Sequence, residues 1–333
     1  MKILIIKTSS MGDVIHTLPA LTDASIAIPG IRFDWLVEEA FAEIPQWHPA
    51  VDRTIPVAIR RWRKSILKTM GSPEWRGFRN ELKRTHYDLA IDAQGLLKSA
   101  FLTRYVKCPI YGYDRQSVRE PLASVAYNVR LPVSKHLHAV ERIRHLFAGA
   151  LNYNLPTSTG DFGLGRDRFA RETPTEPTVV FLHGTTRADK HWPEPYWLSL
   201  CKRLGSRGVQ VLLPWHGADE KARAVRIAAN NPNARVLPKL QLSGIANVLA
   251  ESSGFVAVDT GLGHLASALG VPGVSLYGPT SPALVGTYGD HQKHLEARLF
   301  DSNRQDNSIV PAIMQSLTPG RVESALQDLG IIS

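Results

Sequence analysis

The residues best suited to chemistry stand in loops that directly follow short apolar runs. The first loop, KTSSMGD (residues 7–13), follows the run ILII and leads into a helical stretch. It has neither the GxGxxG spacing nor the Gly-Lys-Ser/Thr ending of the common phosphate-binding loops. Asp13 therefore has two interpretations: a carboxylate that caps the helix by accepting N–H bonds, or a general base at the mouth of a site.

A second loop, HGTTRADKHWP (residues 183–193), follows the first apolar run in the second half of the chain. The hydroxyls of Thr185 and Thr186 and the ammonium of Lys190 offer hydrogen-bond donors and positive charge, which suit a diphosphate. An ordinary solvated loop is the alternative.

The stretch DTGLGHLASALGVP (residues 259–272) combines a strand end, two glycines and a helix start. We expect Asp259 to end a buried strand, and Gly261 and Gly263 to let the backbone approach a ligand closely. A helix that starts near His264 would present free N–H groups and its positive dipole end to an anion. These features predict a phosphate contact, although His264 could simply be a polar residue at a helix start.

Trp215 in LLPWHGADE (residues 212–220) follows another apolar run of the same half. Its flat ring could stack on a nucleotide base. A tryptophan buried in the core is an equally ordinary interpretation.

A basic segment, AIRRWRKSILKTM (residues 58–70), lies in the first half. Between Asp52 and His86 the chain has ten Lys/Arg and three Asp/Glu. A solvated helix face is one interpretation. The other is a docking surface for anionic lipid head groups, in which the cations hold phosphates or carboxylates and the interleaved apolar residues reach toward acyl chains. Nucleic acid is the weaker candidate because no DNA- or RNA-binding motif accompanies the charges.

The charge of the 333-residue chain is unevenly distributed. Residues 1–155 hold 22 Lys/Arg against 14 Asp/Glu, whereas residues 156–333 hold 17 against 16. Nearly all of the net charge of +9 therefore lies in the first half, which indicates an anionic partner there.

Several absences narrow the class of protein. There are two cysteines, no apolar run long enough to span a membrane and no signal-peptide pattern, so we expect a soluble cytoplasmic protein. Asp-x-Asp, His-Glu-x-x-His, Gly-x-Ser-x-Gly and Cys-x-x-Cys are also missing. A catalytic metal has no obvious ligands, so a departing diphosphate would need Lys190 and backbone N–H groups for its charge.

Short apolar runs alternate with helical patterns along the chain, which predicts the α/β class with parallel sheets covered on both faces. Strands are predicted at residues 3–6, 33–37, 89–92, 179–183, 209–214, 255–259 and 274–277. Helices are predicted at residues 14–27, 75–85, 138–150, 195–207, 218–230, 243–252, 264–269 and 321–329. Pro19 predicts that the first helix is kinked or starts late.

Two doubly wound domains are expected, facing each other across a cleft. The segment 156–177 is rich in Pro and Gly and is the predicted linker between a domain of residues 1–155 and a domain of residues 178–333. The pattern assigns no packing partner to the last helix.

Three motifs, in this order along the chain, resemble the ADP-heptose:lipopolysaccharide heptosyltransferases. They are KTSSMGDVIHTLPALTDA, HGTTRADKHWP, and VDTGLGHLASALGVP with the later LYGPTSP. The likeness runs from residue 1 to about residue 290. It implies a GT-B type glycosyltransferase with two Rossmann-like domains and the active site between them. It further implies an inverting, metal-independent transfer of L-glycero-D-manno-heptose from ADP-heptose to a Kdo residue of Kdo2-lipid A, with no cofactor.

The resemblance also implies roles for single residues. Asp13 matches the general base, and Lys190 matches a catalytic residue at the diphosphate. The residues that match the donor site are Thr185, Thr186, Lys190, Trp215, Glu220, Asp259, Thr260, Gly261 and His264. The residues that match the acceptor site are Lys7, Ser10, Arg60, Arg61, Arg63, Lys64 and Arg119.

The type I branch of the family is favoured over type II, which adds heptose to heptose. A Kdo acceptor brings carboxylates as well as lipid A phosphates, and both suit the cations of residues 60–64. The implied location is peripheral, on the cytoplasmic face of the inner membrane, with no nucleic acid as partner. A nucleotide-sugar epimerase and a non-catalytic lipid A-binding protein on the same scaffold are the rival interpretations.

Overall fold

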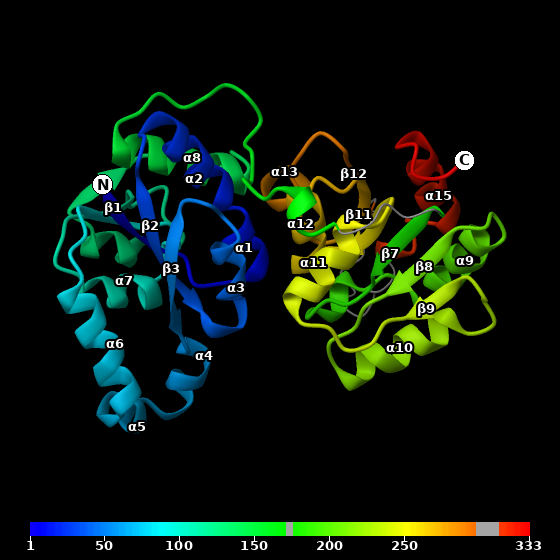
Figure 1. Cartoon of the computed structure of the whole chain (residues 1–333), viewed down its shortest axis with the longest axis horizontal. Helices are drawn as coiled ribbons and strands as arrows, with labels where there is room; N and C mark the ends of the chain where they lie inside the picture. Colours follow the sequence, from blue (N-terminus) through cyan, green and yellow to red (C-terminus); the bar gives the residue numbers. More distant parts are fainter. Residues whose placement is uncertain (171–175, 298–312) are drawn as a thin grey trace, which may run out of the picture. The chain divides into compact units, whose positions relative to one another are not determined.

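The computed structural model describes residues 1–170, 176–297 and 313–333 and divides the chain into two compact units, Met1–Gly163 and Leu164–Ser333. Each unit is built on one six-stranded parallel sheet flanked by helices (Figure 1). The predicted α/β class and the two Rossmann-like units are thereby confirmed. The division at residue 163 falls within the predicted linker.

The first sheet has the strand order β3-β2-β1-β4-β5-β6. Its strands are β1 (Lys2–Ile6), β2 (Arg32–Glu38), β3 (Val51–Val57), β4 (Leu89–Asp92), β5 (Ile110–Tyr113) and β6 (Val129–Leu131). Its α-helices are α1 (Met11–Ile15), α2 (Leu18–Ala27), α3 (Glu43–Gln46), α4 (Ile59–Trp62), α5 (Ile66–Gly71), α6 (Pro73–Arg84), α7 (Leu97–Thr103) and α8 (Ala139–Leu151). Three short 3₁₀ helices join them, η1 (Glu39–Phe41), η2 (Arg63–Ser65) and η3 (Pro121–Ala126).

The second sheet repeats this order as β12-β11-β10-β7-β8-β9. Its strands are β7 (Thr178–Leu182), β8 (Gln210–Leu213), β9 (Ala234–Val236), β10 (Gly254–Val258), β11 (Gly273–Tyr277) and β12 (Gln292–Glu296). Its helices are η4 (Arg166–Arg168), η5 (Ala188–Lys190), α9 (Glu194–Gly205), α10 (Ala218–Ala228), α11 (Leu242–Ala250), α12 (Gly261–Ala268), α13 (Pro282–Val285) and α15 (Pro319–Asp328).

The central strands show why a continuous apolar run forms a buried parallel strand. Residues 3–6 of β1 are fully buried, and β1 pairs in parallel with β2 on one side and with β4 on the other. A strand with neighbours on both edges and helices on both faces has no side toward solvent, so its sequence does not alternate between apolar and polar residues. The strands that the pattern missed are β3, β5, β6, β9 and β12, and in β3, at the edge of its sheet, buried and exposed residues are mixed.

Two expectations about helices are resolved. The first helical run divides into α1 and α2, and Pro19 lies in the first turn of α2, where a missing N–H is harmless. The late start predicted from Pro19 is confirmed. The last helix, α15, packs against α9, and its residues Val322, Ala325 and Leu326 belong to the core of the second unit.

Two predicted boundaries are wrong by a few residues. β10 ends at Val258, so Asp259 is the first residue after the strand. α12 begins at Gly261, which places His264 inside the helix, where the residue is only 7% exposed.

Candidate functional site

The strand orders mark one switch point in each sheet. β1 and β4 are neighbours in the first sheet and β7 and β10 in the second, and the chain proceeds away from them in opposite directions. In open α/β sheets the loops at the carboxyl ends of such strand pairs are where ligands bind. The three family-like motifs follow β1, β7 and β10, so all three lie at switch points.

At the first switch point, Asp13 uses its two carboxylate oxygens differently. Oδ2 accepts the backbone N–H of Ser10 at 2.7 Å and the Ser10 hydroxyl at 2.9 Å. Oδ1 lies 3.5 Å from Nζ of Lys7, and about a third of the Asp13 side chain is exposed. One oxygen therefore holds the start of α1 while the carboxyl group remains accessible.

The surroundings keep Asp13 ionised. Burial works to raise the pKa of its carboxyl group, but the charge of Lys7, the hydrogen bonds from Ser10 and the charge of Arg119 together hold that pKa below its ordinary value. Hydrogen bonds and nearby cations favour the charged form of a carboxylate. An ionised, accessible carboxylate is able to accept a proton at neutral pH.

The loop after β4 fixes the loop that carries Asp13. Oε1 of Gln94 accepts the backbone N–H groups of Thr8 and Ser9 at 2.8 and 3.1 Å. Lys7 is buried and its Nζ donates to the carbonyl oxygen of Ala93 at 3.0 Å. These contacts bridge some 85 positions in the sequence, so no local pattern could indicate them.

Lys98 of α7 is a residue that the sequence interpretation missed. Its Nζ donates to the hydroxyl of Ser9 at 2.9 Å. Burial lowers the pKa of Lys98, while Glu38 and Asp13 raise it and Arg60 and Arg63 lower it. Lys98 therefore lies within electrostatic range of both the Asp13 loop and the basic segment.

The basic segment begins beside this group. Glu38, at the end of β2 and only 3% exposed, accepts the backbone N–H of Arg60 at 3.0 Å. Arg60, Arg63 and Lys64 are exposed on α4 and η2. Two predicted acceptor residues, Lys7 and Ser10, thus contact Asp13. Two others, Arg60 and Arg63, lie within electrostatic range of Lys98.

Arg61 differs from its neighbours. Its guanidinium makes a bidentate pair with Glu74, at 2.9 and 2.7 Å, and lies 3.3 Å from Glu39. Two carboxylates already balance its charge, so Arg61 is less available to an anion than Arg60. Arg119, the last predicted acceptor residue, is exposed between β5 and η3.

At the second switch point, the loop after β7 meets the loop after β10. Lys190 Nζ lies 2.5 Å from Asp259 Oδ2, and both side chains are mostly buried, at 17% and 10% exposure. The hydroxyl of Thr185 donates to the carbonyl oxygen of Asp259 at 3.2 Å. Thr186 is exposed beside them. An ammonium and hydroxyl groups at paired strand ends form a cradle for an anion.

The start of α12 completes this cradle. Thr260 is its N-cap residue and makes no side-chain cap hydrogen bond, and Gly261 is the first helical residue. A helix start without a side-chain cap leaves backbone N–H groups directed at its end, where they favour a negative charge. Thr260 and Gly261 therefore contribute backbone N–H groups, whereas His264 is covered in the next turn.

Trp215 and Glu220 lie on the β8 side of the same sheet. The Trp215 indole N–H donates to the carbonyl oxygen of Leu237 at 2.7 Å, and Lys221 Nζ lies 5.0 Å from the ring centroid. The ring is partly exposed, so it is not the buried core tryptophan of the alternative. Glu220 accepts the backbone N–H of His216 at 2.9 Å. Its Oε1 lies so close to Gly184 that a Cβ added there would be 1.8 Å away, so a larger residue at this position would displace Glu220.

His183 and Arg223 are further residues that the motif did not single out. The His183 ring is fully buried beside Trp197, and burial followed by the charge of Arg223 lowers its pKa to about 4. Arg223 donates to the carbonyl oxygen of His183 at 3.4 Å and lies 2.8 Å from Nδ1 of His191. These contacts shape the base of the loop that carries Thr185 and Lys190.

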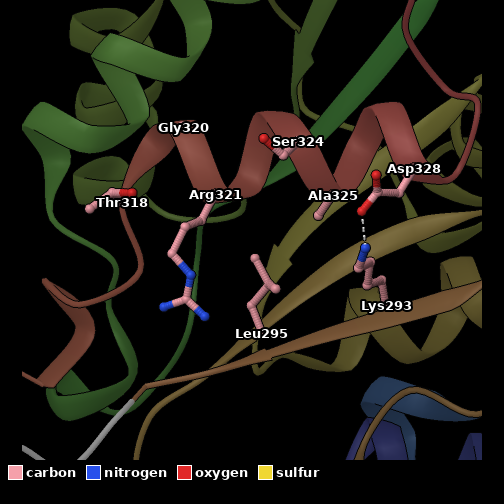
Figure 2. A pocket seen from close by; sticks show the side chains of 8 residues that line it. All are labelled: Lys293, Leu295, Thr318, Gly320, Arg321, Ser324, Ala325 and Asp328. Carbon is pink, nitrogen blue, oxygen red and sulfur yellow. Dashed lines mark hydrogen bonds and ion pairs between the residues drawn. The ribbon is translucent and has the colours of Figure 1, made fainter.

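Neither candidate site offers a metal centre. Among residues 1–170, 176–297 and 313–333, no group of three or more His, Cys, Asp or Glu side chains is arranged to hold a metal ion. A separate pocket of about 330 Å³ lies between β12 and α15 (Figure 2). It is lined by Arg321 and by an ion pair between Lys293 and Asp328, and it contains none of the predicted site residues.

With this geometry in place, comparison with known proteins decides the family. The model of glycosyltransferase family 9 (heptosyltransferase) matches residues 75–309. The chain belongs to this heptosyltransferase family.

Individual relatives of this heptosyltransferase agree with the family. It is 55% identical to lipopolysaccharide heptosyltransferase 1 of Pseudomonas aeruginosa, over 98% of this chain and 97% of the relative. It is 52% identical to the protein of the same name from Escherichia coli K12, over 88% and 92% of the two chains. The structure of E. coli heptosyltransferase WaaC with ADP is similar with a TM-score of 0.89, 47% identity and coverage of 99% and 100%. The predicted GT-B type fold is confirmed by this match.

Proposed function

We propose that this heptosyltransferase transfers L-glycero-D-manno-heptose from ADP-heptose to a Kdo residue of Kdo2-lipid A, in the biosynthesis of the lipopolysaccharide inner core. The observation that carries the proposal is Asp13, an ionised and accessible carboxylate at a switch point, within electrostatic range of the cations Lys7, Lys98 and Arg119. Relatives that are more than half identical are named lipopolysaccharide heptosyltransferase 1, and a solved relative holds ADP. The names of the relatives support a lipopolysaccharide acceptor, and the bound ADP supports an ADP-linked donor.

In the proposed reaction Asp13 is the general base of a single displacement. The acceptor hydroxyl oxygen forms a bond to the anomeric carbon of the heptose while its proton passes to Asp13. The bond from that carbon to the diphosphate oxygen breaks, and ADP departs with the electron pair. Because attack and departure occur on opposite sides of the carbon, the anomeric configuration inverts.

Lys190 and the start of α12 carry the developing charge of the diphosphate. The Lys190 ammonium and the backbone N–H groups of Thr260 and Gly261 are preorganised donors at the end of β10. Donors that are already in place stabilise a leaving group without reorganisation during the reaction. Asp259 holds Lys190 in position, and Trp215 and Glu220 take the adenosine.

The acceptor is a lipid, so we also propose that the protein acts peripherally on the cytoplasmic face of the inner membrane. No helix in the part of the chain that the structure describes is long and apolar enough to cross a bilayer.

The test is an incubation of the protein with ADP-heptose and Kdo2-lipid A. Mass spectrometry should detect one added heptose, and one equivalent of ADP should appear for each product. Binding of the lipid without ADP release would overturn the proposal in favour of a non-catalytic lipid A-binding protein. Consumption of the donor without a lipid product would favour an epimerase.

A heptosyltransferase of type II is the second candidate, since it would use the same donor residues. An acceptor that already carries one heptose distinguishes the two. The type I assignment requires preference for the acceptor that ends in Kdo, and preference for the heptosylated acceptor would contradict it.

A further inference from the structure

The helix α5 exposes two large apolar side chains. Leu67 is 89% exposed and Met70 is 52% exposed. Trp62, which precedes them in the basic segment, is instead only 8% exposed and packs edge-to-face on Trp75 at a centroid distance of 5.2 Å. Trp62 is thus a buried anchor of the basic segment, whereas Leu67 and Met70 are an exposed pair, a distinction that the sequence does not make.

The buried anchor is held by aromatic neighbours and not by the exposed pair. Trp62, Trp75 and Phe78 form a cluster with centroid distances of 5.2 to 5.5 Å. The hydroxyl of Thr69 donates to the carbonyl oxygen of Trp62 at 3.1 Å, which ties α5 to this cluster. Leu67 and Met70 therefore present apolar surface to the solvent from a segment that is held by other residues.

The aromatic cluster continues to α7. The ring of Phe101 is 42% exposed and lies parallel to Trp75 at 6.3 Å. The guanidinium of Arg104 lies 5.2 Å from the centroid of Phe101. An exposed aromatic ring with a cation over it therefore adjoins the segment that carries Leu67.

Exposed cations lie on the elements that carry the exposed apolar residues and on η2 and α6. Exposed Lys and Arg side chains lie on η2, α5, α6 and α7, at positions Arg63, Lys64, Lys68, Arg76, Lys83, Arg84 and Arg104. Exposed apolar residues within a strongly positive surface match an anionic bilayer, whose phosphates attract the cations while its acyl boundary accepts the apolar groups. We call Leu67, Met70 and Phe101, with these cations, the docking surface.

This docking surface adjoins the candidate acceptor site. α5 and α6 lie together at the end of the first unit that is lowest in Figure 1, and α4 leads from them back to β3. Arg60 at the start of this path is bonded through its backbone to Glu38, and Arg60 and Arg63 act electrostatically on Lys98 beside Asp13. A bilayer in contact with α5 would therefore hold a lipid head group near the cations that lead to Asp13.

We propose that the docking surface binds the surface of an anionic phospholipid bilayer, with Leu67 and Met70 entering the boundary between head groups and acyl chains. The inference rests on the proposed function in one respect, namely that the acceptor is a membrane lipid. A soluble protein or nucleic acid is the less suitable partner, because Leu67 and Met70 flank a cation, Lys68, in one short helix and no nucleic-acid motif is present in the sequence.

The test compares L67S/M70S with wild-type protein in flotation with vesicles of phosphatidylglycerol and phosphatidylcholine. We expect wild-type protein to float with the mixed vesicles and not with pure phosphatidylcholine, and the variant to bind at least ten-fold more weakly. I26S/V225S is the matched control, since Ile26 and Val225 are 74% and 52% exposed and lie outside the docking surface. Unchanged thermal unfolding of both variants shows that the fold is intact.

Activity on a water-soluble Kdo acceptor without acyl chains separates the two proposals. We expect L67S/M70S to keep wild-type activity on this acceptor and to lose it on Kdo2-lipid A in vesicles. Equal flotation of variant and wild type, or equal binding to neutral vesicles, would overturn the docking surface while leaving the proposed function intact. No activity of wild-type protein on either acceptor would instead overturn the proposed function.

Discussion

The geometry of Asp13 allows one side chain both to hold a helix start and to act as the proposed general base. Oδ2 receives two hydrogen bonds from Ser10 and thereby holds the start of α1, while Oδ1 faces Lys7 at 3.5 Å. The bonds that fix the carboxylate also favour its charged form. Capping and base catalysis are therefore compatible in this geometry.

The first prediction concerns the charge of Asp13. D13N keeps an oxygen that can accept from Ser10 but cannot take a proton, so kcat should fall by about 10² to 10⁴-fold. ADP should bind with an unchanged Kd in calorimetry. S10A, which removes one of the two hydrogen bonds and leaves the carboxylate, should have a much smaller effect on kcat. A D13N enzyme with nearly normal kcat would contradict the assignment of the base.

The second prediction concerns the ammonium of Lys190. A hydrogen bond from a charged group contributes about 1.5 to 3 kcal/mol, so K190Q should weaken ADP binding by roughly ten- to a hundred-fold in calorimetry. Because the same charge stabilises the leaving group, kcat should fall as well. K202Q is the matched control, since Lys202 is an exposed cation of α9, and it should change neither value. Normal ADP affinity of K190Q would exclude Lys190 from the diphosphate site.

At the scale of elements, α4 and η2 present cations that are not equivalent. Arg61 is engaged by Glu74 and Glu39, whereas Arg60 and Arg63 are exposed near Lys98. An adjacent run of arginines in the sequence gives no indication of this difference, because the two glutamates come from η1 and α6.

The third prediction follows from this difference between Arg61 and its two neighbours. Each cation near an anionic surface contributes about 1 kcal/mol, so R60Q and R63Q should each raise the acceptor KM roughly five-fold, with little change in kcat. R61Q should raise it less, because the Arg61 guanidinium is already paired with Glu74 and Glu39 and is less available to the acceptor. Steady-state kinetics with Kdo2-lipid A measures all three variants. An R61Q effect larger than those of R60Q and R63Q would contradict the structural distinction.

At the scale of the whole molecule, each unit contains a deeply buried histidine whose pKa is strongly lowered. His48 in the first unit is 2% exposed and His183 in the second is fully buried. Burial is the largest cause that lowers the pKa of each to about 4, from an ordinary value of 6.5. Between these two pH values the unfolded chain binds more protons than the folded one, so acid favours unfolding.

The fourth prediction is a loss of stability in mild acid. Stability due to the neutral histidines is fully present above pH 6.5 and decreases as the pH falls toward 4, by up to about 1.4 kcal/mol per pH unit for each histidine. The thermal unfolding midpoint should therefore fall between pH 6.5 and 4.5. H48Q should reduce this pH dependence, while H145Q, at an exposed position of α8, should leave it unchanged. Identical pH profiles of H48Q and wild type would exclude His48 as a cause.

Much of the fold could be predicted because it depends on local patterns. Runs such as residues 3–6 and 89–91 are continuous in apolar character because β1 and β4 are central strands without a solvent face. Strands β3, β6 and β9 could not be predicted in this way, since they are short or lie at the edges of the sheets and carry polar residues. The loops with Asp13, Lys190 and Asp259 were evident because they follow those central strands.

The sequence by itself thus determined the α/β class, the loops that carry the candidate site and, through three ordered motifs, the family. Only the tertiary structure decided which side chains meet: Gln94 and Lys98 at the Asp13 loop, Lys190 at Asp259, and Glu74 at Arg61. It also decided that Trp62 is buried and Leu67 exposed. The physical reason is that helix and strand periods are set by neighbouring residues. The partners of a side chain depend instead on the order in which the strands assemble, and that order brings distant segments to one edge of a sheet.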